Sequence, residues 1–230
     1  MGIAKTTAKF VGPRVAMSAG PKVTAGYVRV LLDRAIDGVG PFKPVRVACD
    51  ARLALAGGRV EDAIGESVGI HVRYASAQGF LTNLGGVASM VVTIPANVAG
   101  LALLQCHLVA AIAYLRGYDL DDPRVRNAVM ATLLGKAEVA KAVKDGRLPT
   151  TPMGLATSPV HDPALDEQIA RAVTTALFGR VSGKQGATAF LRKVPVLGGG
   201  VGAVADARST AQLASYARHE LRDRRLPPQR

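Results

Sequence analysis

Apolar residues recur through most of the chain at intervals of three and four, the spacing of one face of an α-helix. Between Val60 and Val72, for example, every fourth residue is Val or Ile. Clusters of Gly and Pro separate the periodic stretches. The pattern predicts helices over Val23–Ile36, Val45–Ala56, Arg59–Leu81, Ala96–Leu115, Arg124–Val143, Ala164–Phe178, Val181–Lys193 and Gly202–Arg225, with a loop at Gly146–Pro163 and a turn at Pro195–Gly200.

These elements indicate an all-α fold, because no alternating strand pattern with a hairpin turn interrupts them. We expect a single-domain bundle of about seven to nine helices with central apolar helices, since the chain length fits one hydrophobic core. Residues 1–20 are expected to form an N-terminal extension, residues 21–225 the helical domain and residues 226–230 a disordered tail.

One long segment stands out because it carries no charge. From Tyr74 to Leu115 the chain has no Asp, Glu, Lys or Arg, and Pro95 divides this run. The part after Pro95, Ala96–Leu115, reaches the roughly 20 residues that a helix needs to cross a bilayer. Its polar residues and many alanines make it a poor transmembrane helix, so we expect contact with a membrane surface or hairpin-like insertion in preference to spanning.

The net charge is +12, from 29 basic and 17 acidic residues, and this excess points to an anionic partner. Nucleic acid is not expected, because no aromatic residues are interleaved with the basic ones for stacking. Anionic membrane lipid is the expected partner, met by a basic end of the last helix. Arginines supply that candidate lipid-facing set: Arg218, Arg222, Arg224 and Arg225.

Two cysteines without a disulfide or zinc spacing, and no apolar leader, indicate a cytoplasmic location at the inner face of the cell membrane. Cys106 beside His107 is not a catalytic pair, because neighbouring residues on a helix point about 100° apart. His107 is expected in the core, and the other three histidines at the surface. No metal site, cofactor or catalytic residue is predicted.

Four polar residues in apolar surroundings form a candidate polar cluster: Asn97, Gln105, His107 and Asp206. The glycines near residue 200 lack the Lys and Ser/Thr of a phosphate-binding loop. With Asp206 and Thr210 they form instead a stripe of small residues for close helix packing. Asp122 is expected to cap a helix that begins at Pro123.

Three sequence blocks resemble the EcsC family of bacterial proteins. They are GFLTNLGG (Gly79–Gly86) leading into IPAN (Ile94–Asn97), AYLRGYDLDDPRVR (Ala113–Arg126) and VPVLGGGVGAVADARST (Val194–Thr210). The resemblance covers about Arg59 to Ala217 and implies a helical, membrane-associated protein whose family is named for a gene beside an ABC-transporter operon affecting secretion. It supplies no agreed catalytic residues. Small residues in the first and last blocks are the candidate membrane or packing contacts: Gly85, Gly86, Pro95, Gly198 and Gly202.

Three functions follow from these features. The first is a membrane-associated protein that supports transport, secretion or envelope processes through lipid or protein contacts. The second is a helical hydrolase-like enzyme with an internal polar pocket. The third is an oligomeric scaffold that self-associates or binds membrane transport machinery.

Overall fold

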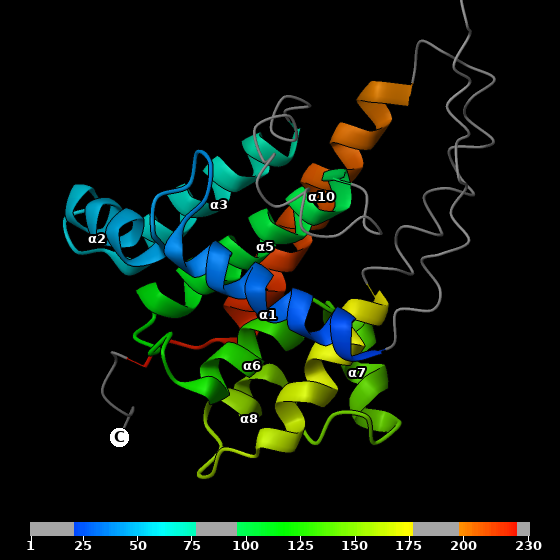
Figure 1. The fold of residues 1–230 in the computed structure, drawn as a ribbon. Helices are drawn as coiled ribbons and strands as arrows, with labels where there is room; N and C mark the ends of the chain where they lie inside the picture. The colour runs from blue at the N-terminus through cyan, green and yellow to red at the C-terminus, as the bar shows by residue number, and fades with distance from the viewer. Residues whose placement is uncertain (1–20, 77–95, 177–197, 225–230) are drawn as a thin grey trace, which may run out of the picture.

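The protein is all-α in the parts that its computed structural model describes, residues 21–76, 96–176 and 198–224 (Figure 1). This confirms the predicted fold class. Residues 163–176 are helical, and the other helices are α1 Pro21–Asp37, α2 Val45–Leu55, α3 Val60–Ser76, α5 Ala96–Leu115, α6 Pro123–Thr132, α7 Lys136–Lys144, α8 Pro152–Ala156 and α10 Gly198–Glu220.

The uncharged helix α5 forms the centre of the bundle, with α1, α2, α3, α6 and α10 packed around it. From Leu103 to Ala113 every side chain is buried. Burying one Leu or Ile side chain contributes about 1.5–3 kcal/mol, and the alanines between the large residues let five neighbouring helices approach. The absence of charged residues from α5 is therefore explained by the burial of this helix inside the protein.

Helix α3 runs antiparallel to α5. Glu61 near the start of α3 contacts Arg116 just beyond the end of α5, and further along the pair His71 contacts His107. The start of one helix thus lies beside the end of the other.

Helix α10 runs parallel to α5. The Gln105 amide lies 3.3 Å from the Ser209 hydroxyl, and eleven residues on, Arg116 reaches the Arg218 carbonyl. The last described turn of α3 and the first turns of α5 and α10 consequently lie toward the same end of this α3–α5–α10 layer (Figure 1).

The sequence signals for helix ends are confirmed at several places. Asp122 caps α6, because its carboxylate accepts the backbone N–H of Arg124 at 2.8 Å, and Pro123 occupies the first helical position. Helix α2 ends before Gly57 and Gly58, which both have positive φ, of 62° and 82°.

The single helix predicted over Arg124–Val143 is two helices, α6 and α7. They meet at Gly135, whose φ of 84° no helix accommodates. Leu133 and Leu134, beside the break, are buried. Because both side chains are apolar, the helical pattern of the sequence continues across a point where the backbone turns. The loop predicted over Gly146–Pro163 also contains the one-turn helix α8.

The last helix spans Gly198–Glu220, not Gly202–Arg225. Gly198 to Gly200, predicted as part of a turn, are helical. At its other end the chain turns away, and the backbone N–H of Arg224 donates to the carbonyl of Arg116 at 2.9 Å. Helix α3 is described only as far as Ser76, and the predicted helix Val181–Lys193, residues 1–20 and the tail lie outside the described residues.

Candidate functional site

The structure brings two of the four predicted polar-cluster residues together and separates a third from them. Gln105 and Asp206 line one cavity. His107 points elsewhere, because two residues along a helix rotate a side chain by about 200°. The side chain of Asn97 lies outside the described residues.

The cavity that holds Gln105 and Asp206 has a volume of about 800 Å³ and lies between α5, α10 and the turn from α6 to α7. Its walls include Leu101, Ala102 and Leu213. Gln105 is fixed in its wall by hydrogen bonds from its amide to Ser209 and Thr210 of α10, at 3.3 and 3.4 Å. The volume of the cavity falls within the range of about 300–1,000 Å³ that is typical of small-molecule sites.

On the opposite face of α5, His107 contacts His71. The distance between Nδ1 of His107 and Nε2 of His71 is 2.9 Å, and Phe42 stacks on His71 at 5.0 Å. Both histidines are buried, so the expectation that His71 lies at the surface is wrong: its partner sits 36 residues away in sequence, on another helix. Burial lowers the pKa of His71 to about 3 and that of His107 to about 4.

Two of the four arginines predicted to face lipid at the end of the last helix make contacts within the protein. Arg218 forms an ion pair with Glu61 at 2.7 Å, and Arg224 lies over the Tyr118 ring at 5.9 Å. Partial burial raises the pKa of Glu61, but ion pairs with Arg218 and Arg116 outweigh it, so the net pKa is lowered. Arg222 is exposed, and Arg225 lies outside the described residues.

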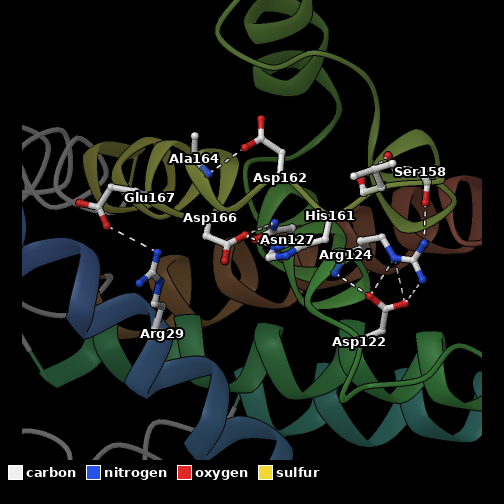
Figure 2. Close-up of polar contacts among 11 residues, drawn as sticks. Arg29, Asp122, Arg124, Asn127, Ser158, His161, Asp162, Ala164, Asp166 and Glu167 are labelled. Carbon is white, nitrogen blue, oxygen red and sulfur yellow. Dashed lines mark hydrogen bonds and ion pairs between the residues drawn. The ribbon is translucent and has the colours of Figure 1, made fainter.

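A second polar cluster fastens the segment after α8 to α6 (Figure 2). Asp166 accepts a hydrogen bond from the Asn127 amide at 2.6 Å, and its carboxylate lies 2.9 Å from His161 Nε2. Nearby, Arg124 is held by Asp122 and donates to the Ser158 carbonyl at 2.6 Å. Sequence reasoning missed this cluster, apart from the cap at Asp122, because no short-range spacing marks it.

The Ser158 hydroxyl in that cluster donates its hydrogen to the Val160 carbonyl and not to a histidine, so it does not form the serine–histidine pair of a nucleophilic site. Both cysteines, Cys49 and Cys106, are buried, and burial raises the pKa of Cys106 to about 12, which keeps it a thiol. No group of three metal-ligating side chains occurs within the described part of the chain.

The positive charge is concentrated in the segments that flank the described helices. Residues 1–20, 177–197 and 225–230 contain three, four and two basic residues and no acidic one, which gives nine of the twelve excess charges. Along the chain, the uncharged segment 77–95 connects α3 to α5, and the basic segment 177–197 immediately precedes α10.

Two of the five predicted contact residues belong to the end of the α3–α5–α10 layer at which α5 and α10 begin. Gly85, Gly86 and Pro95 fall outside the described residues, whereas Gly198 and Gly202 lie in the first turns of α10. Val204, two residues further on, is 68% exposed. Among the described helices, none has both the length and the apolarity needed to span a bilayer.

The model of the EcsC protein family matches residues 58–226, so the chain belongs to this family. No curated protein matches the chain. No solved structure matches it either.

Proposed function

We propose that this EcsC family protein is a peripheral membrane protein that binds an anionic bilayer through the end of the α3–α5–α10 layer. The observation that carries the proposal is the uneven charge. The basic segment 177–197 precedes α10 in the sequence and the uncharged segment 77–95 precedes α5, and these two parallel helices begin at the same end of the layer. A surface with both cations and apolar residues is the composition that interfacial binding requires.

Electrostatics sets the expected strength of binding. Each Lys or Arg near an anionic membrane surface contributes about 1 kcal/mol, and this attraction falls off within a Debye length. Three cations therefore contribute about 3 kcal/mol, or about a hundredfold in affinity. Membrane contact of this kind weakens as the salt concentration rises.

On this proposal the protein acts in the cytoplasm at the inner face of the cell membrane, where anionic lipids provide a negative surface potential. It would support transport, secretion or envelope processes by contact with lipid or with a membrane transport protein. The arginines at the end of α10 then play a smaller part, because Arg218 is already paired with Glu61.

The test is flotation of the full chain with vesicles of phosphatidylglycerol and phosphatidylcholine. A variant with Lys184, Arg192 and Lys193 changed to Gln should bind about a hundredfold more weakly. The matched control changes the same number of cations in and just after α7, all exposed: Lys141, Lys144 and Arg147. It should bind within about threefold of the unaltered protein.

Two results would refute the proposal. One is a protein that stays out of the floating fraction at low salt with vesicles rich in phosphatidylglycerol. The other is an equal loss of binding in the two triple variants, which would show that net charge alone, and not this end of the molecule, governs the contact.

The cavity favours a second candidate function, the binding of a small apolar ligand. Trp in place of Ala205, an exposed residue that lines the cavity, would occupy part of its volume. Trp in place of Ala211, exposed on the same helix but not part of the lining, is the matched control. A fluorescent fatty acid should bind to the control and lose affinity for the Ala205→Trp variant; equal affinities would exclude the cavity as its site.

A further inference from the structure

The contacts of His71 and His107 with the backbone fix where their protons lie. Nδ1 of His71 is 2.6 Å from the carbonyl oxygen of Ser67, and Nε2 of His107 is 3.0 Å from the carbonyl oxygen of Lys43. A carbonyl oxygen only accepts hydrogen bonds, so each of these two outer ring nitrogens must carry a proton.

The inner nitrogens face one another. A neutral imidazole has one N–H, which the outer contact already uses on each ring. Nε2 of His71 and Nδ1 of His107, 2.9 Å apart, would then present two lone pairs. A hydrogen bond at that distance requires a proton between them. The three contacts therefore need three protons, whereas two neutral rings supply two.

We propose that His71 and His107 form a buried site for one extra proton, which is shared between their inner nitrogens as the solution is acidified. At neutral pH the pair holds two protons, the inner lone pairs repel, and the rings move apart. The third proton closes the contact. The closed pair joins α3 and α5 to the loop between α1 and α2, through the Lys43 carbonyl.

The surroundings set a limit of one added proton. Arg52 of α2 acts on both imidazoles and donates to the Ser67 hydroxyl at 3.4 Å. Lys43 on the loop contacts His107 through its carbonyl. Among the described residues, no carboxylate lies close enough to change the pKa of either ring. A second added proton would place two like charges side by side in a buried site that already faces a guanidinium.

The test is histidine NMR of the ¹⁵N-labelled full chain, with two-bond correlations that report which ring nitrogen carries each proton. At pH 7.5 we expect N–H at Nδ1 of His71 and at Nε2 of His107. On acidification both rings should titrate together, with one midpoint and one proton per pair. That midpoint should lie below about 6.5, the ordinary pKa of a histidine.

A His107→Gln variant assigns the signals and should abolish the joint titration. Three results would overturn the proposal: an N–H on an inner nitrogen at pH 7.5, separate titration of the two rings with two protons, or unfolding before any joint titration. Each is read from the unaltered protein, so the test stands even where the variant fails to fold.

Discussion

Replacing Arg116 with Met should weaken the fold more than any other single change of a charged residue in the described part of the chain. The Arg116 side chain is only 10% exposed. Its guanidinium donates to the carbonyls of Arg218 and Leu221 at 2.8 and 3.0 Å, and to the Glu61 carboxylate at 2.5 Å. It thereby satisfies the end of α10 and joins it to the start of α3.

The magnitude follows from what the variant leaves behind. Two carbonyls lose a charged donor, and a hydrogen bond to a charged group contributes about 1.5–3 kcal/mol. Glu61 is half exposed and retains Arg218, so its lost pair adds little. Arg116 Nε is buried without a hydrogen-bond partner among the described residues, which reduces what the native residue contributes. We expect a loss of about 2–4 kcal/mol.

The assay is urea unfolding followed by circular dichroism, with the m-value checked for constancy so that the midpoint reports stability. Arg218→Met is the matched control, because its side chain is 42% exposed and shares the partner Glu61; it should lose no more than about 1 kcal/mol. Equal losses in the two variants, or a loss below about 0.5 kcal/mol for Arg116→Met, would refute the role assigned to the buried guanidinium.

Four further outcomes are expected. Burial lowers the pKa values of His71 and His107 below the ordinary 6.5, so their contribution to stability is complete above pH 6.5 and is lost as the pH falls toward 4. At pH 5, each ring that stays unprotonated in the folded protein should lower the free energy of unfolding in urea by about 2 kcal/mol. A stability independent of pH over this range would contradict this expectation. Leu104→Ala, at a fully buried site in α5, should cost about 2–5 kcal/mol by the same assay. Gly38→Ala should lower the melting temperature, since Gly38 has a φ of 88° and an added Cβ would lie 2.6 Å from backbone. Cys106 should resist a thiol reagent until the protein unfolds, because its thiol is buried and its pKa is about 12; rapid labelling of the native protein would show an opening of the core.

Much of the fold could be predicted because its main signals are local. Ile64, in the four-residue stripe of α3, is fully buried, and the cap at Asp122 forms between neighbours in sequence. The break at Gly135 was missed for a physical reason. The leucines before it are buried, so the apolar pattern continues through a turn that depends on the backbone conformation of one glycine.

The polar sites were harder to predict because their partners are far apart in sequence. His71 lies in α3 outside the stripe of Val and Ile residues, and its burial depends on Phe42 in a loop and His107 in another helix. Asp166 and Asn127 likewise meet across 39 positions. In contrast, the separation of Gln105 from His107 follows from helical geometry alone, since a two-residue step turns a side chain to the other face.

The position of α5 changes the basis for expecting membrane contact. An uncharged helix of bilayer length is explained by the five helices packed around it. To enter lipid, α5 would have to leave those contacts and expose Gln105 and His107 to a medium that offers no hydrogen bonds, which costs several kcal/mol for each unsatisfied group. The remaining argument is the charge carried by residues 177–197, the segment that precedes α10 in the sequence. Membrane binding should therefore depend on salt and on anionic lipid far more than on the apolar length of α5.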